Sequence, residues 1–196
     1  MPKSYSEQER AYIRKRLKEE GAKCLAQYGI RRTTVDEIVK RVKIPKGTFY
    51  LFYQSKELLL FDIILEQHET LEKELYASVG NIKPETCNAE QLTDIIFNYY
   101  KLIDNSPALK MLNSDEIELL ARKLPPNVIE SHLTHDFFTV KDILSMLPLK
   151  QSVDIEALNA AFLAIYCSTL YKEKIGEDNF DKAMRLLIKG LVYQIM

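Results

Sequence analysis

The stretch KIPKGTFYLFYQSKELL, Lys43–Leu59, concentrates side chains that can bind nucleic acid. Lys46 can donate to guanine acceptors or to a phosphate, and Thr48 offers both a hydroxyl and a methyl group. Gly47, which has no side chain, would let the backbone approach a ligand closely. The hydroxyl of Tyr50 can reach a phosphate oxygen while its ring lies against the protein. These types and spacings suggest polar recognition of a polyanion.

Lys56 stands where the next helix is predicted to begin, and a cation there opposes the helix dipole by some tenths of a kcal/mol. A phosphate bound beside that helix end would reverse the penalty. The alternative is an exposed lysine whose amine points into water.

Four aromatic rings fall within five positions of this stretch. We interpret Phe49 and Tyr53 as core residues of a small helical domain. Phe52 either packs in that core or faces a ligand, and the pattern leaves both possibilities open. A hydrophobic minicore accounts for at least two of the rings, so their number alone does not indicate a binding site.

Two short helices joined by a tight turn would position these side chains. Thr33 or Thr34 caps a helix that ends near Val42, with an acidic residue three positions after each threonine, as in a capping box. Pro45 then pre-sets a new helix, which we place from Lys46 to about Phe52. This pattern predicts a helix-turn-helix, whose second helix lies in the DNA major groove.

Longer helices flank the motif. An apolar stripe predicts a helix over Glu7–Tyr28, within which Gly21 indicates a close contact with another helix. Gly29 would end that helix in a left-handed conformation. Ser55 caps a long helix that continues to about Ser78.

Helical spacing of apolar residues continues through nearly the whole chain, while β-branched runs are short. We therefore predict an all-α fold of about nine helices. Residues 1–54 form a three-helix, helix-turn-helix DNA-binding head, and residues 55–196 form a helical ligand-binding and dimerisation body. The last two helices are placed over Ile155–Lys174 and Asn179–Ile195.

Charge is unevenly distributed along the 196 residues. Residues 1–60 hold 14 Lys and Arg against 7 Asp and Glu, whereas residues 61–196 hold 13 against 21, so the net charges are +7 and −8. This asymmetry suits a polyanion-binding head on an acidic body, although a solvated basic face would look the same.

Other features argue against several classes of protein. The three cysteines are far apart, which indicates reduced thiols rather than a disulfide framework or a zinc cluster. The apolar runs are too short to span a membrane, and the charged N-terminus is unlike a signal peptide, so we expect a cytoplasmic protein. We find no nucleophile–base set and no phosphate-cradling glycine loop, and we predict neither an enzyme nor a cofactor. His132, His135 and Asp136 have a spacing that could bind a metal, but a solvated histidine pair is the preferred interpretation.

The segment GIRRTTVDEIVKRVKIPKGTFYLFYQSKELLL, Gly29–Leu60, resembles the N-terminal domain of the tetracycline-repressor (TetR) family. The matching marks are Gly29, the threonine pair, the KGTFY run that begins at Lys46, and SKEL from Ser55. This resemblance implies phosphate contacts from Thr34, Tyr50 and Lys56. It also implies base-facing positions at Val35, Lys46, Gly47, Thr48 and Leu51.

The resemblance further implies a ligand cavity in the body and a homodimer built by the last two helices. Aromatic and aliphatic residues of the body are candidates for the pocket, although such residues are more often core: Phe97, Tyr100, Leu112, Ile117, Phe137, Phe138, Phe162 and Tyr166. Small and apolar residues of the last two helices are candidates for a four-helix interface: Ala161, Ala164, Ser168, Met184, Leu187, Ile188 and Leu191. The alternative is that both helices are internal core.

The sequence thus predicts a DNA-binding transcriptional regulator that binds a palindromic operator as a homodimer. It would act as a repressor that an apolar or aromatic small molecule releases from the operator. The rival hypothesis is an all-helical small-molecule-binding protein or enzyme whose head no longer reads DNA. The basic head and the Lys46–Tyr50 pattern favour the first.

Overall fold

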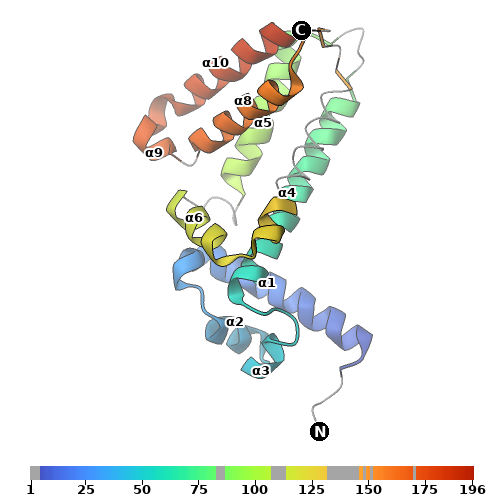
Figure 1. Ribbon diagram of the computed structural model, residues 1–196, viewed down its shortest axis with the longest axis vertical. Coiled ribbons are helices and arrows are strands. Elements are labelled where there is room, and N and C mark those ends of the chain that lie inside the picture. Colours follow the sequence, from blue (N-terminus) through green and yellow to red (C-terminus); the bar gives the residue numbers. More distant parts are fainter. Residues whose placement is uncertain are drawn as a thin grey trace. The chain divides into compact units, whose positions relative to one another are not determined.

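The computed structural model describes residues 5–82, 87–106, 114–131, 146–147, 149–150, 152–169 and 171–196. These residues form helices and turns without a strand, which confirms the all-α prediction (Figure 1). The chain divides into two compact units: Met1–Gln67 with Ser106–Leu124, and His68–Asn105 with Pro125–Met196. Among the described residues, no helix combines the length and apolarity that crossing a membrane requires.

Unit 1 begins with α1 (Glu7–Arg32). Ser6 caps it in a complete capping box with Glu9. The backbone at Gly29 is non-helical, with φ 70° and ψ −176°, so the regular helix breaks next to the predicted end at Tyr28, and α1 then resumes beyond this kink to Arg32. The prediction of a close contact at Gly21 is confirmed, because a Cβ atom there would lie 2.8 Å from Ile63 Cδ1.

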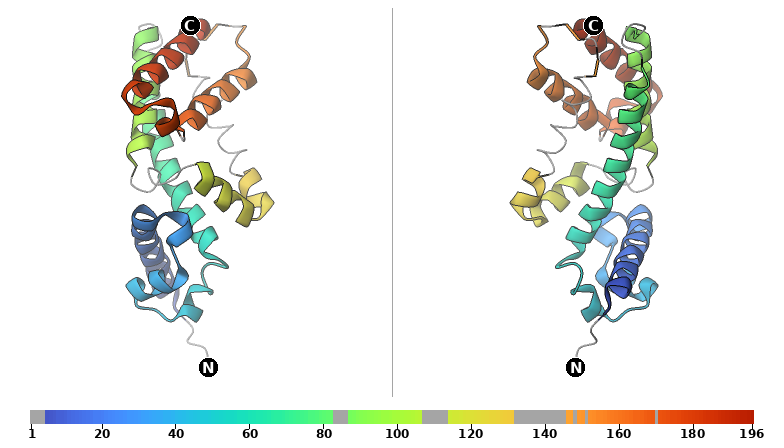
Figure 2. Two further views of the ribbon diagram at one scale, coloured as in Figure 1. Left: turned by 90° about the vertical axis from the view of Figure 1, so that its left-hand side faces the viewer. Right: turned by 90° about the vertical axis from the view of Figure 1, so that its right-hand side faces the viewer.

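The helix-turn-helix consists of α2 (Val35–Val42) and α3 (Lys46–Phe49), which pack together and rest on α1 through α2 (Figure 2). Thr34 is the cap of α2, since its hydroxyl accepts from the Glu37 N–H at 3.2 Å. The third helix is shorter than the predicted span to Phe52. After Phe49 the chain makes tighter turns, with the Phe52 N–H donating to the Phe49 carbonyl.

Two further helices complete unit 1. The helix α4 (Lys56–Gly80) begins at the predicted place, and Ser55 Oγ accepts from the Leu58 N–H at 3.2 Å. Although α6 (Ser114–Lys123) lies far along the sequence, it packs against α1. The Glu116 carboxylate of α6 accepts from the Ile30 N–H at 3.0 Å, beside the kink at Gly29. The predicted head therefore folds together with the start of α4 and with α6.

Unit 2 is centred on α10 (Glu177–Ile195), which packs against α5 (Ala89–Asn105) and α8 (Ile155–Thr169) (Figure 1). The short α9 (Lys172–Ile175) precedes α10, so the predicted helix Ile155–Lys174 is two helices. Residues 126–131 are also helical. Ion pairs line the α5–α10 contact, with Arg185 on Asp94, Lys189 on Glu90 and Lys101 on Asp181.

Candidate nucleic-acid interface

Phe49 fixes the recognition helix α3 to the head. Its ring is fully buried and meets Tyr50 edge-on at 5.4 Å between centroids. Tyr53 is half-buried, and its hydroxyl donates to Asp62 Oδ2 of α4 at 2.6 Å. Burial raises the pKa of Tyr53, and the Asp62 carboxylate raises it further. The prediction of a core role is thus confirmed for Phe49, whereas Tyr53 combines partial burial with a polar anchor.

Tyr50 and Leu51 are exposed at the C-terminal end of the recognition helix. Phe52 is half-buried, and the Arg10 guanidinium carbon lies 5.1 Å above its ring. Arg10 also reaches toward the Leu51 carbonyl oxygen at 3.5 Å. The structure therefore gives Phe52 a packing role against α1, the first of the two alternatives left open by the sequence.

Thr48 differs from the other candidate base-facing residues because it is only 7% exposed. Its hydroxyl lies 3.3 Å from the hydroxyl of Tyr5, which precedes α1. Thr48 can reach a base edge only if Tyr5 moves. Gly47 is exposed, and a Cβ atom built there would meet nothing within 4 Å. Packing therefore does not require a glycine at this position, whereas close approach of a ligand to the backbone would.

Lys46, the first residue of the recognition helix, contacts the start of α2. Its Nζ lies 2.9 Å from Asp36 Oδ2, with side-chain exposures of 51% and 72%. The hydrogen bond to Asp36 raises the pKa of Lys46. Beside Asp36, Thr34 is exposed and Val35 is half-buried. The contact between Lys46 and Asp36 thus brings the first turns of α2 and α3 together.

Lys56 has a different environment from the one predicted. Its Nζ donates to the carbonyl oxygens of Thr33 at 2.6 Å and Ile30 at 2.8 Å, and lies 3.5 Å from that of Arg31. Burial lowers the pKa of Lys56, and the charge of the nearby Glu57 carboxylate opposes that shift only in part. The amine therefore caps the last carbonyls of α1, which offsets its unfavourable place at the start of α4.

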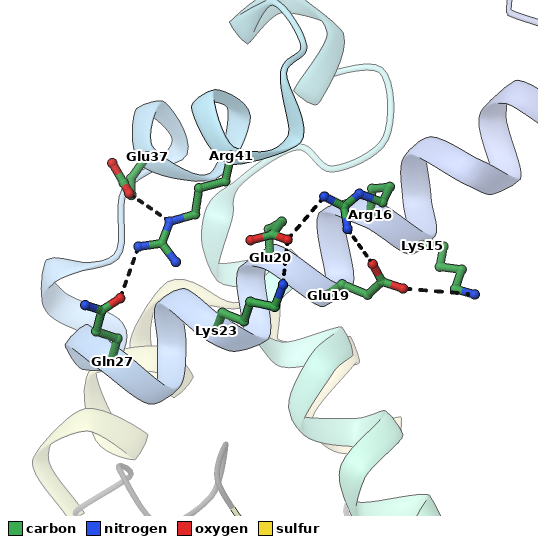
Figure 3. Close-up of polar contacts among 8 residues, drawn as sticks. All are labelled: Lys15, Arg16, Glu19, Glu20, Lys23, Gln27, Glu37 and Arg41. Carbon is green, nitrogen blue, oxygen red and sulfur yellow. Dashed lines mark hydrogen bonds and ion pairs between the residues drawn. The ribbon is translucent and has the colours of Figure 1, made fainter.

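Many cations of the head are paired with acids, as Figure 3 shows for α1 and α2. Arg16 binds Glu19 and Glu20, Lys23 binds Glu20, and Arg41 donates to Glu37. Among the described residues, five cations of unit 1 have side chains that make no ion pair, ring contact or hydrogen bond: Arg14, Arg31, Arg32, Lys40 and Lys43. These exposed side chains are the ones free to meet phosphates.

The predicted pocket is only partly described. Leu112, Phe137 and Phe138 lie outside the described residues, as do His132, His135 and Asp136 of the possible metal site. Ile117 belongs to unit 1, and the other four to unit 2. There Tyr100 is buried, and its hydroxyl donates to the Phe162 carbonyl at 2.8 Å. Phe97 packs under the Arg185 guanidinium at 5.7 Å, and Tyr166 is half-buried. Within the described chain, no cluster of three metal-binding side chains occurs.

The predicted dimer residues fall on two faces of unit 2. Met184 and Ile188 are 2% and 0% exposed, so they belong to the core and have no surface to give to a second chain. For these two the interface assignment was wrong. Leu187 is 54% exposed and Ala164 is also exposed, whereas Ala161, Ser168 and Leu191 are half-buried. The outward stripe of α10 is completed by Leu186, Gly190 and Tyr193.

Several contacts were missed by sequence reasoning. Asp36 and Lys46 are ten residues apart on different helices, and Tyr5 meets Thr48 across 43 residues, so neither pair has a local sequence signature. The Glu116 contact with Ile30 spans 86 residues and depends on tertiary packing.

Comparisons with known proteins agree with this geometry. Residues 19–63 match the family described as bacterial regulatory proteins, tetR family. An uncharacterized HTH-type transcriptional regulator of Bacillus subtilis, YuxN, is 28% identical over 123 residues, which span 59% of this chain and 41% of that relative.

Two solved structures share the fold. SmeT, the repressor of the Stenotrophomonas maltophilia multidrug efflux pump SmeDEF, has a TM-score of 0.66 and 14% identity, covering 93% of this chain and 89% of SmeT. A complex of SmeT with triclosan is also known. FadR of Bacillus subtilis, solved with stearoyl-CoA, has a TM-score of 0.64 and 15% identity, covering 91% of this chain and 95% of FadR. Residues 19–63 therefore match the tetR family of bacterial regulatory proteins, and the chain has the fold of these two solved structures.

Proposed function

We propose that this protein is a transcriptional regulator that binds a palindromic operator as a homodimer and releases it when a small molecule binds. The observation that carries the proposal is the helix-turn-helix, with Lys46 exposed at the start of a recognition helix that Phe49 anchors and with Tyr50 and Leu51 exposed directly after its end. Such a helix can enter the major groove, where base edges are distinguishable.

The remaining predicted contacts have unequal support. Thr34 and Val35 lie at the start of α2 next to Asp36, where Thr34 can meet a phosphate and Val35 a base. Gly47 leaves room for a base edge, and Thr48 would act only after displacement of Tyr5. The phosphate contact of Lys56 competes with its three carbonyl contacts and is the least supported of the set.

Dimerisation would use the outward stripe of α10 together with Ala164 of α8. Leu186, Leu187, Gly190 and Tyr193 recur at three- and four-residue intervals, which places them on one helical face. Gly190 carries no side chain and a Cβ atom there would meet nothing, so a partner helix could approach closely. Two such helices from each chain would form a four-helix interface and set the spacing of the two heads.

Control by a ligand requires that the ligand favour a conformation in which the heads are wrongly spaced. Triclosan and stearoyl-CoA, found with SmeT and FadR, both carry large apolar parts, which agrees with the apolar or aromatic ligand that we expect here. The helix α4 contributes to both units and starts at Lys56, so we propose it as the element that a ligand would shift.

The test is fluorescence anisotropy with labelled duplex from upstream of the gene, against a scrambled duplex of equal length and composition. We expect tighter binding to the upstream duplex and a steep loss of affinity with salt, because bound cations release counterions. Equal, weak binding to both duplexes at low salt would favour the rival hypothesis of a helical ligand-binding protein without an operator.

A further inference from the structure

The first turns of α2 and α3 bring one carboxylate and one ammonium group together on the surface of the helix-turn-helix. Lys46 Nζ and Asp36 Oδ2 are 2.9 Å apart, and both side chains are at least half exposed. Asp36 is the second residue of α2, and Lys46 is the first residue of α3. The pair therefore stands where the two helices begin, next to Thr34.

Stability gives little reason for this pair. An exposed ion pair contributes only a fraction of the free energy of folding, because water screens it and side-chain entropy opposes it. Glu37, which lies in the same first turn, already provides a negative charge that interacts favourably with the helix dipole of α2. On a surface that approaches phosphates, a further carboxylate is unfavourable unless it finds a hydrogen-bond donor there.

We propose that Asp36 and Lys46 together read one G·C base pair in the major groove, an inference that rests on the proposed DNA-binding function. Lys46 would donate to guanine O6 and N7, and Asp36 would accept from the N4 amino group of cytosine. Guanine O6 and cytosine N4 are hydrogen-bonded to each other, at the roughly 2.9 Å typical of such bonds. The 2.9 Å between Nζ and Oδ2 matches that spacing.

In this arrangement four groups form a ring in which donors and acceptors alternate: the Lys46 amine, guanine O6, the cytosine N4 amino group and the Asp36 carboxylate. Each charge keeps its partner while gaining a base contact, so neither is left unpaired when water leaves the interface. Lys46 alone could bind guanine, but only the carboxylate adds an acceptor for the opposite base of the same pair.

Other base pairs fit less well. In an A·T pair, Asp36 could accept from adenine N6, but the adenine N7 acceptor lies beside that donor and would repel the carboxylate. Lys46 would face only thymine O4, next to the methyl group. In a reversed C·G pair, the N4 donor of cytosine would face the Lys46 ammonium group, and the guanine acceptors would face the Asp36 carboxylate. A good contact of this kind discriminates between base pairs by roughly 5- to 150-fold.

The experiment selects bound duplexes from a randomised library with the full-length chain and sequences them. We expect one position in each half-site to require G·C. The preference there should fall at least about five-fold in Asp36→Asn and in Lys46→Met. The double variant Asp36→Lys with Lys46→Asp keeps both charges but exchanges donor and acceptor, so it should prefer C·G at that position.

Glu7→Gln, in the exposed first turn of α1, removes one negative charge from the same unit and is the matched control. It should keep the base preference of the unmodified chain. Thermal melting by circular dichroism shows whether each variant is folded at the temperature of selection.

Two results would count against the proposal in different ways. If Asp36→Asn binds all sequences more tightly with an unchanged base preference, Asp36 only repels phosphate and the inference is wrong. If the unmodified chain enriches no sequence at all, the proposed function fails and the inference falls with it.

Discussion

Lys56→Met tests whether the Lys56 amine caps α1 or binds DNA. Methionine keeps most of the aliphatic side chain but cannot donate to the carbonyl oxygens of Thr33 and Ile30, which now receive hydrogen bonds of 2.6 and 2.8 Å. A hydrogen bond that involves a charged group contributes about 1.5–3 kcal/mol. The Lys56 side chain is half-buried, so water can replace part of what is lost. We therefore expect the free energy of unfolding to fall by about 2 kcal/mol.

For a chain of this length, that loss corresponds to a decrease in Tm of about 4–8 °C, which calorimetry can measure. The same variant is titrated with duplex DNA at several salt concentrations. If Lys56 caps α1, the slope of log affinity against log salt stays unchanged. If Lys56 instead neutralises a phosphate, the slope falls by about 0.9 for each chain. Lys40→Met, at an exposed lysine without a carboxylate partner among the described residues, is the control for the stability change.

A lower slope with an unchanged Tm would refute the capping role and restore the phosphate contact that the family resemblance implies. A lower Tm with an unchanged slope would confirm the cap. Both measurements are needed, because a destabilised head could lose DNA affinity at every salt concentration without losing a phosphate contact.

Three further variants test other parts of the chain. Leu187→Glu should convert the proposed dimer to a monomer in light scattering, because it buries an unpaired charge in the proposed interface, whereas Leu102→Glu, at an exposed leucine of α5, should not. Gly29→Ala should lower Tm by several degrees, since φ is 70° and the added Cβ would clash with Glu116 Oε1; an unchanged Tm would show that the kink relaxes freely. Glu20→Gln should flatten the loss of stability in acid: Lys23 lowers the pKa of Glu20 below its usual 4.5, so the ionised form stabilises the fold at neutral pH and is lost as the pH falls through the lowered pKa. Parallel acid-unfolding curves for both proteins would contradict that role.

Local signals were sufficient to predict most of the head. The threonine pair, Pro45 and Ser55 act through hydrogen bonds or backbone restriction within three or four residues, and the structure places the starts of α2, α3 and α4 accordingly. Gly21 was informative because glycine in a helix interior is costly unless another helix needs the space.

Partners far apart in sequence could not be predicted in this way. Lys56 was interpreted from the dipole of its own helix, whereas its amine contacts carbonyls of α1 that precede it by more than twenty residues. On α10, the spacing of apolar residues predicted a stripe but could not identify the surface against which it packs. Met184 and Ile188 face the core, and only the packing of α10 on α5 and α8 shows that Leu187 lies on the opposite side.

The same distinction changes how the charge of the head should be counted. A net charge of +7 over residues 1–60 includes Arg16, Lys23 and Arg41, which are bound to acids on their own surface. Such pairs contribute little to counterion release, since each cation already has an anion beside it. The capacity for phosphate contacts then rests on the cations of unit 1 that lack an acid, together with Tyr50 and Thr34. If Lys46 engages a base through its pair with Asp36, salt dependence and sequence preference come from different residues, and each can be changed by mutation without the other.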